Sequence, residues 1–318
     1  MVRSPAVRIA IVGSGGVGGY FGGRLAAAGA DVTFLARGVH LEAMRTRGLR
    51  ITSPKGDLHL PRVKAESDPH AVGPADIVFF AVKLYDTESA LAMLPPLVGP
   101  DTIVIGFQNG VETVASLTRA VGAAHTAGGV SYVSAVIAEP GVIRHTAMDH
   151  LIFGMPDGSP SLPLQALLDA CRPAGFQSTL STDITVDIWT KFVRLSVFSG
   201  MTAVTRGPIG VIVNDPELLE MLKAAVRETM AVAHAKGIAV PSRMDEDVAV
   251  AYKALPPGAK ASMLEDLERG RRIELPWLSG AVVRLGREAG VPTPIHAFIA
   301  TVLKPYVNGR TAGGQGPG

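Results

Sequence analysis

The stretch RIAIVGSGGVGGYFGGRLAAAGADVTFLAR, from Arg8 to Arg37, contains the pattern that decides the fold. A short β-branched run over residues 8–12 ends at a glycine cluster. From Gly18 the apolar residues follow helical spacing as far as Gly29, and residues 31–36 are typical of a second strand. A strand, a glycine turn, a helix and a strand within about 30 residues form a βαβ unit. This part of the chain therefore predicts the opening of a parallel α/β sheet.

The glycine cluster matches the pattern GxGxxG at Gly13, Gly15 and Gly18. Glycine permits a tight turn and a close approach of the backbone to a pyrophosphate, and the helix N-terminus offers free N–H groups. A glycine-rich structural turn is the alternative, which the preceding strand and the following helix disfavour. We expect the whole turn to hold the diphosphate of a dinucleotide: Gly13, Ser14, Gly15, Gly16, Val17 and Gly18.

Arg37 follows the second strand, where NAD-binding proteins usually carry an acidic residue. Asp31 lies at the start of that strand, at the opposite edge of the sheet. A guanidinium pairs with a 2′-phosphate through charge-assisted hydrogen bonds. The sequence therefore predicts NADP, bound as NADPH, unless Arg37 is an ordinary solvated arginine.

Alternating strands and helices continue to residue 181. The pattern predicts strands over 76–82, 102–106, 128–136, 141–146 and 151–154, and helices over 87–94, 111–120 and 162–174. Lys83 and Asn109 follow two of these strands, at the carboxyl ends where an open parallel sheet binds its ligands. The alternatives are an exposed lysine and an ordinary turn asparagine.

After residue 181 the strand pattern gives way to helical periodicity. Helices are expected over 184–205, 216–237, 243–255, 261–269 and 276–290, with Gly or Pro at most of the breaks. We therefore predict an α/β protein with an N-terminal Rossmann-type, doubly wound domain over 1–181 and a mostly α-helical domain over 182–318. Residues 311–318 are expected to form a flexible tail.

Composition narrows the class of protein. Of the 318 residues, 47% are hydrophobic and 18% charged, which is enough to bury large cores. The net charge of +2 does not indicate a nucleic-acid partner, and the single Cys171 with scattered histidines gives no zinc spacing. The N-terminus breaks into glycines unlike a signal peptide, and no run reaches the ~18 apolar residues of a membrane span. We expect a cytoplasmic protein without a metal; its oligomeric state is open, with a homodimer as one candidate.

Lys191 stands in a largely apolar segment, residues 188–198. Its side chain either extends along the helix to solvent or is desolvated, with a lowered pKa that suits proton transfer. A later segment, SMLEDLERGRRIE, begins at Ser262 and ends at Glu274. Local ion pairs on a solvated helix would also explain that segment.

Together these motifs resemble those of the ketopantoate reductase (2-dehydropantoate 2-reductase) family. The resemblance covers nearly the whole chain, through the glycine turn, Arg37, AVK with Lys83, QNG with Asn109, residues 128–145, WTK with Lys191, and Ser262 and Glu274 at the family's spacing. It implies a Rossmann domain, a helical domain and the NADPH-dependent reduction of a 2-keto acid, a reaction of pantothenate biosynthesis.

The resemblance also implies roles for single residues. Lys191 matches the proton donor, and Glu274 matches a residue near the nicotinamide ribose and the catalytic lysine. Ser262 matches a residue that contacts the substrate carboxylate. The implied cofactor contacts are the glycine turn, Arg37, Lys83, Asn109, Ala135 and Glu274, and Asn109 would also reach the substrate.

Three positions depart from the family. Its substrate-binding helix usually carries asparagine four and eight residues after the catalytic lysine, where this chain has Leu195 and Ser199. A third asparagine is replaced by Ile209. We expect Ser199 to take part in substrate binding, and we expect a 2-keto acid more apolar than ketopantoate. The sequence does not identify that acid.

Two other functions fit the sequence. A different two-domain Rossmann dehydrogenase, acting on a 3-hydroxy acid or a glycerol phosphate, would share the opening but not the set Lys191, Ser262 and Glu274. A non-catalytic NADP-binding redox sensor would be consistent with the lost asparagines, whereas the retention of Lys191 and Glu274 argues against it.

Overall fold

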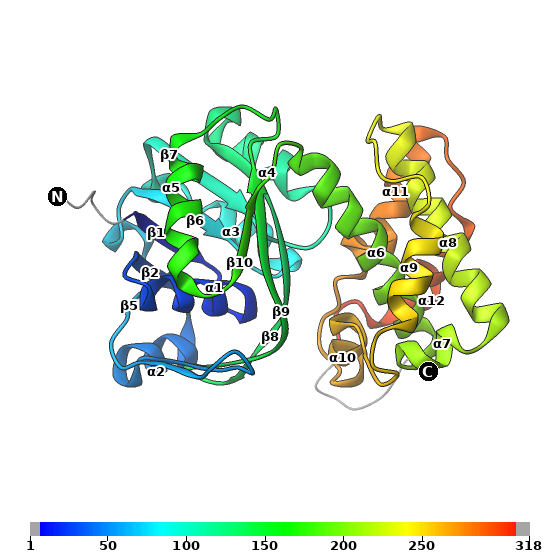
Figure 1. Cartoon of the computed structure of the whole chain (residues 1–318), viewed down its shortest axis with the longest axis horizontal. Helices are drawn as coiled ribbons and strands as arrows, with labels where there is room; N and C mark the ends of the chain where they lie inside the picture. The colour runs from blue at the N-terminus through cyan, green and yellow to red at the C-terminus, as the bar shows by residue number, and fades with distance from the viewer. Residues whose placement is uncertain (1–6, 310–318) are drawn as a thin grey trace. The chain divides into compact units, whose positions relative to one another are not determined.

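The computed structural model describes residues 7–309, which form two compact units (Figure 1). The first unit comprises residues 7–108 and 112–187, and the second comprises residues 109–111 and 188–309. The division after Asp187 comes six residues later than the expected boundary at 181, and residues 109–111 are a part of the second unit that the sequence did not predict. The expected tail, 311–318, lies outside the described residues.

A ten-stranded sheet organises the first unit, in the order β4-β3-β9-β8-β7-β6-β1-β2-β5 with β10 beside β9. The strands are β1 (Arg8–Val12), β2 (Asp31–Leu35), β3 (Leu49–Thr52), β4 (Leu58–Leu60), β5 (Lys64–Glu66), β6 (Ala75–Phe80), β7 (Val98–Gly106), β8 (Thr126–Glu139), β9 (Val142–Gly154) and β10 (Gln177–Leu180). The part β5-β2-β1-β6-β7-β8 is parallel throughout. This is the predicted Rossmann-type arrangement, and its strand order reverses between β1 and β6, where such sheets bind ligands.

The helices of the first unit bury both faces of the central strands. They are α1 (Gly16–Ala27), α2 (Gly38–Arg47), α3 (Thr87–Leu91), α4 (Thr113–Val121) and α5 (Leu162–Cys171). In β1, Ile9 and Ile11 belong to one buried cluster and Ala10 and Val12 to another. This alternation is the period of two expected of a strand covered on both faces.

Several elements differ from the sequence-based expectations. The runs 141–146 and 151–154 are parts of the single strand β9, which pairs antiparallel with β8. The pattern also did not predict α2, nor the strands β3, β4, β5 and β10, each of which has only three or four residues. Periodicity over so few residues does not separate a strand from a loop.

The second unit is helical, as predicted. Its helices are α6 (Ile184–Thr205), whose first turn belongs to the first unit, α7 (Ile209–Val213), α8 (Pro216–Ala235), α9 (Met244–Lys253), α10 (Ser262–Glu268), α11 (Ser279–Ala289) and α12 (Pro294–Leu303). Helical periodicity did not predict α7, which has five residues, or α12. The N-terminus of α12 is held by Glu228 of α8, whose carboxylate accepts hydrogen bonds from the backbone N–H groups of Ile295 (2.8 Å) and His296 (3.1 Å).

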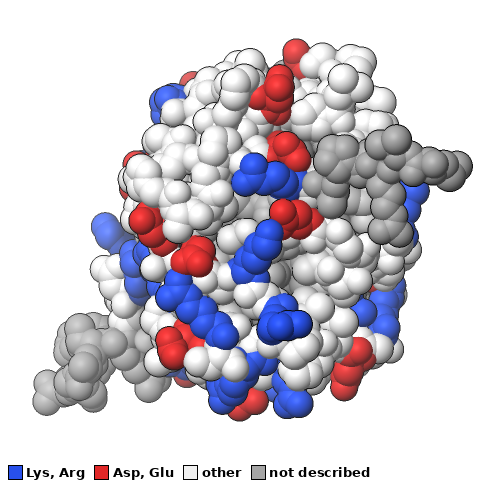
Figure 2. All heavy atoms as spheres, turned by 90° about the vertical axis from the view of Figure 1, so that its left-hand side faces the viewer, with Lys and Arg blue, Asp and Glu red and all other residues white. Residues whose placement is uncertain are grey.

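A continuous apolar core joins the helices of the second unit. Phe192 and Val197 of α6 are buried with Leu222 and Val226 of α8 and with residues of α9 and α11. The described part of the chain contains no helix with both the length and the apolar character needed to cross a membrane. On the face drawn in Figure 2, acidic side chains are interspersed among the basic ones.

Candidate active site

The glycine turn between β1 and α1 is packed directly against the backbone of neighbouring strands. Gly13 has φ +100°, and a Cβ added to it would lie 2.7 Å from the carbonyl carbon of Ala81, just beyond β6. A Cβ on Gly16 would overlap the carbonyl oxygen of Ala135 in β8, and one on Gly18 would overlap the carbonyl oxygen of Gly13. These three glycines are therefore required by the fold itself.

Gly15 is different from its three neighbours. A Cβ on Gly15 would meet no atom of the protein within 4 Å. Gly15 is the N-cap of α1, no side chain caps this helix, and its first turn contains no acidic residue. Unpaired N–H groups and a positive dipole end next to open space fit an anionic diphosphate, so the residues of the turn fit the predicted ligand.

Ser14 contributes to this turn through its backbone. Its side chain is 5% exposed, and its hydroxyl donates a hydrogen bond to the carbonyl oxygen of Leu35 at the end of β2 (2.9 Å). The carbonyl oxygen of Ser14 lies 3.0 Å from Nε2 of His40 on α2. His40 was not predicted from the sequence, because an isolated histidine on a short helix belongs to no motif.

Arg37 and Lys83 lie at the positions expected for residues that follow strands. Arg37 is the exposed N-cap of α2, two residues after β2, and its Nη2 lies 3.3 Å from Sδ of Met93. Lys83 is exposed and follows the end of β6 by three residues. An exposed guanidinium at this edge is available to an anionic group on a ligand.

Gln108, which the sequence analysis also missed, fixes the start of the loop that carries Asn109. Its Nε2 donates to the carbonyl oxygen of Val82 (3.0 Å) and to Oγ1 of Thr87 (2.9 Å). Its Oε1 accepts a hydrogen bond from Oγ1 of Thr113 (3.0 Å). The three bonds join the end of β7 to the segment after β6 and to α4. They fix the position of the backbone at Gln108, the residue before Asn109.

Three predicted residues from separate segments meet in the second unit. Nζ of Lys191, on α6, donates a hydrogen bond to Oδ1 of Asn109 (3.0 Å). Nδ2 of Asn109 donates to Oε2 of Glu274 (3.3 Å), a carboxylate that is only 6% exposed. The Asn109 amide thus uses its acceptor on the ammonium group and its donor on the carboxylate.

The environment of Lys191 changes its acidity. Burial lowers the pKa of Lys191 from 10.5 to about 8, because a desolvated ammonium is less stable than a hydrated one. The negative charge of Glu274 acts in the opposite direction and limits the fall in the pKa. The result is a lysine that is mostly protonated at neutral pH and that gives up its proton readily.

The hydrogen-bonded group does not include three other residues singled out in the sequence: Ser262, Ser199 and Ile209. Ser262 is the exposed first residue of α10. Ser199 is 1% exposed, and its Oγ is buried without a hydrogen-bond partner. Ile209 is fully buried in the core, with its N–H bonded to the carbonyl oxygen of Ala259 (2.9 Å). The role of Ser199 in substrate binding stays a prediction, and Ile209 is a core residue.

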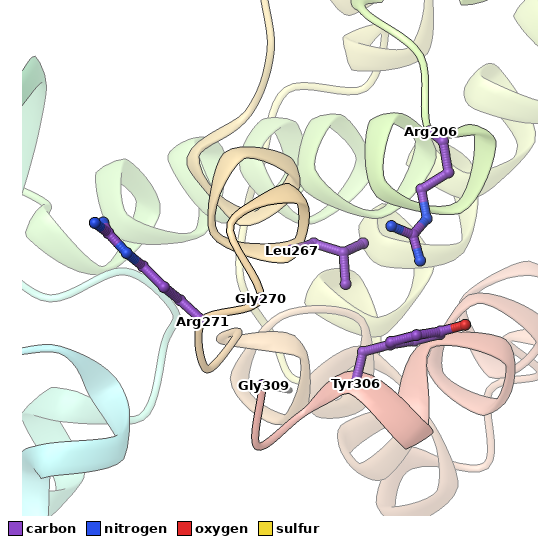
Figure 3. A pocket seen from close by; sticks show the side chains of 6 residues that line it. All are labelled: Arg206, Leu267, Gly270, Arg271, Tyr306 and Gly309. Carbon is purple, nitrogen blue, oxygen red and sulfur yellow. The ribbon is translucent and has the colours of Figure 1, made fainter. Parts of the chain in front are cut away.

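The second unit also contains a small pocket that none of the predicted site residues lines. It is lined by Arg206, Leu267, Gly270, Arg271, Tyr306 and Gly309 (Figure 3). The guanidinium of Arg206 stands 5.0 Å from the ring centre of Tyr306, Leu267 points toward the space between them, and Arg271 extends away. The two cations do not converge, so this pocket is not built to bind an anion. Within residues 7–309, no three His, Cys, Asp or Glu side chains cluster as metal ligands would.

Comparisons with known proteins agree on one family. The family model of ketopantoate reductase PanE/ApbA matches residues 9–158, and the model of its C-terminal part matches residues 183–307. A 2-dehydropantoate 2-reductase of Mesorhizobium japonicum is 31% identical, over 94% of this chain and 97% of the relative.

Solved structures give the same result. A PanE/ApbA family ketopantoate reductase from Ralstonia eutropha JMP134 has a TM-score of 0.84 at 32% identity, covering 94% of this chain and 98% of that one. A 2-dehydropantoate 2-reductase from Geobacter metallireducens GS-15 has a TM-score of 0.88 at 29% identity, covering 94% and 99%.

The contrast between Gly15 and Gly16 gives a test of the glycine turn. Gly15→Ala should leave the melting temperature unchanged and abolish most dinucleotide binding, because its methyl group enters only the open space. Gly16→Ala should lower the melting temperature, since its methyl group overlaps the Ala135 carbonyl oxygen and the backbone must shift. Thermal unfolding and fluorescence titration with a nicotinamide dinucleotide measure both effects. Unimpaired binding by Gly15→Ala would remove the turn from the ligand site.

Proposed function

Because the chain belongs to the ketopantoate reductase family of oxidoreductases, we propose that it reduces a 2-keto acid to the 2-hydroxy acid with NADPH. The observation that carries this proposal is the hydrogen-bonded group Lys191, Asn109 and Glu274. It presents a lysine with a pKa of about 8, which is the acid that ketone reduction requires. The relatives named 2-dehydropantoate 2-reductase support the type of reaction.

Two features of the first unit would hold NADPH. Open space lies beside Gly15 at the N-terminus of α1, where the N–H groups of the glycine turn would bind the diphosphate. The exposed guanidinium of Arg37 would bind the adenosine 2′-phosphate, since no acidic side chain stands in its place to accept from a 2′-hydroxyl. Lys83 and the backbone at Ala135 are proposed as further contacts. When bound, the reduced nicotinamide supplies the hydride.

Lys191 would complete the reduction on the oxygen side of the ketone. As the carbonyl carbon gains a hydride, negative charge develops on its oxygen. The Lys191 ammonium would stabilise this charge and then transfer a proton to it. Proton transfer from a donor with a pKa near 8 to an alkoxide is strongly favourable in free energy. The neutral lysine then takes up a proton from water at neutral pH.

Asn109 and Glu274 would keep Lys191 oriented and protonated for this step. The bond from Asn109 to Glu274 fixes which end of the amide faces Lys191, so the ammonium meets an acceptor rather than another donor. The Glu274 carboxylate keeps the lysine from losing its proton entirely on burial. Asn109 would also reach the substrate, and Ser262 is a proposed contact for the substrate carboxylate.

Two apolar side chains lie beside Lys191 on α6. At 3.6 residues per turn, Leu195 and Phe198 lie about 40° and about 20° from Lys191 around the helix, whereas Ser199 lies about 80° away. Leu195 and Phe198 are half-buried, and the Phe198 ring packs 5.2 Å from that of Tyr252. The Tyr252 hydroxyl donates to the carbonyl oxygen of Arg194 (2.7 Å), which fixes the ring pair on α6. We infer that the substrate has an apolar side chain.

The role of Lys191 predicts a particular loss of activity. Lys191→Met should lower kcat for 2-keto acid reduction by roughly 10²–10⁴-fold while the Kd of NADPH changes little. In the unmodified enzyme kcat for reduction should fall as pH rises through about 8, because Lys191 then loses the proton that it donates. Steady-state kinetics across pH 6–10 would show the lower kcat of the variant and the pH dependence of the unmodified enzyme. In Lys191→Arg the fall of kcat near pH 8 should be absent. A Lys191→Met enzyme that keeps most of its turnover would refute the proposed role.

The role of Arg37 predicts selectivity between the two nicotinamide cofactors. The unmodified protein should bind NADPH more tightly than NADH, and Arg37→Ala should weaken NADPH binding by about 1.5–3 kcal/mol through loss of a charge-assisted contact. NADH binding should stay nearly the same in the variant. Titrations of both proteins with both nucleotides measure this, and equal affinities in the unmodified protein would contradict it.

The apolar residues beside Lys191 predict the order of substrates. A 2-keto acid with a branched aliphatic or phenyl side chain should have a higher kcat/KM than ketopantoate, because Leu195 and Phe198 offer no partner to a hydroxyl group. Leu195→Asn should shift the ratio toward ketopantoate by about 1–1.5 kcal/mol. Leu162→Asn, at an exposed position of α5, is the matched control and should not shift it. Faster reduction of ketopantoate than of every apolar analogue by the unmodified enzyme would disprove this.

A further inference from the structure

His40 joins three segments of the first unit at the glycine turn. It lies on α2, three residues after Arg37. Its Nε2 is 3.0 Å from the carbonyl oxygen of Ser14, and its Nδ1 accepts a hydrogen bond from the backbone N–H of Gly141 (3.1 Å), between β8 and β9. The side chain therefore bridges the glycine turn and the β8–β9 connection.

The partners of His40 determine its protonation state. The Gly141 N–H is a donor, so Nδ1 must be the unprotonated nitrogen. Nε2 then carries the hydrogen and donates it to the Ser14 carbonyl. Burial lowers the pKa of His40 below 6.5, against the opposing effect of the bond to Ser14, so the ring is neutral at neutral pH and this tautomer persists.

The bond to Ser14 also sets the direction of a neighbouring donor. The carbonyl of Ser14 and the N–H of Gly15 belong to one planar trans peptide, in which these two groups point in opposite directions. Holding the carbonyl toward His40 therefore turns the Gly15 N–H to the other side of the peptide. The hydroxyl of Ser14, bonded to Leu35, prevents the residue from rotating around this contact.

We propose that His40 is a positioning residue for dinucleotide binding, which orients the Gly15 N–H toward the diphosphate. The proposal rests on the dinucleotide binding of the proposed function, and it does not depend on the substrate or on Lys191. Because the diphosphate is common to NADPH and NADH, His40 affects both nucleotides equally. Arg37, by contrast, acts on the 2′-phosphate alone.

Direct binding measurements with matched variants test this. His40→Leu removes the donor and the acceptor at similar size, and it should raise the Kd of NADPH and of NADH by the same factor, roughly 5–20-fold. His40→Gln should restore most of the affinity, because a side-chain amide presents one donor and one acceptor at about the spacing of the ring nitrogens. Nicotinamide fluorescence gives Kd, and kcat at saturating nucleotide should change little.

His125→Leu is the matched control. His125 is also half-buried in the first unit, and its Nδ1 bonds a backbone carbonyl, that of Thr102 (2.9 Å), away from the glycine turn. It should lose a comparable amount of thermal stability and keep both nucleotide affinities. If His40→Leu does not fold, His40→Asn, whose shorter amide cannot bridge both partners, takes its place.

Four results would overturn the proposal. They are unchanged affinities in His40→Leu, a loss confined to NADPH, no recovery in His40→Gln, and an equal loss in His125→Leu. A protein that binds neither nucleotide would refute the cofactor of the proposed function together with the role of His40. A protein that binds both nucleotides but reduces no 2-keto acid would refute only the proposed reaction, and the His40 measurement would stand.

Discussion

The structure of the first unit depends on a contact between backbones with no side chain between them. The glycine turn before α1 approaches the segment after β6, and the first residue of α1 approaches the carbonyl of Ala135, so closely that a methyl group does not fit at Gly13 or Gly16. This contact places the positive end of α1 at the point where the strand order reverses. Gly15, beside it, is free of such contacts, so the same turn is rigid where it packs and open where a ligand would bind.

The electrostatics of Lys191 follow from two opposing effects. Desolvation alone would favour the neutral amine, and the nearby carboxylate of Glu274 favours the ammonium ion. The amide of Asn109 makes a hydrogen bond to each of them and so joins the ammonium group to the carboxylate. The pKa of Lys191, about 8, therefore reflects burial and the charge of Glu274, whereas Asn109 supplies the hydrogen bonds that join the two groups.

Much of the fold and part of the site were predictable from the sequence. The strand before Gly13 and the helix after it follow from periodicity, and Lys191, Asn109 and Glu274 were identified through family motifs before the structure brought them together. His40 and Gln108 were not predictable, because their roles consist of bonds to backbone groups far away in the sequence. Ser199 was assigned through the family resemblance, from its place eight residues after Lys191; the structure buries it, and its contact with the substrate stays a prediction.

The assignment of residues 109–111 to the second unit has a consequence for how the protein could be divided. The two units look like modules that could be exchanged or expressed separately at the junction after Asp187. A fragment that begins at residue 188 would nevertheless contain Lys191 and Glu274 without the amide that bonds to both. The second unit is therefore not one continuous stretch of sequence, and recombination of two such proteins after Asp187 would pair each lysine with an asparagine from the other parent.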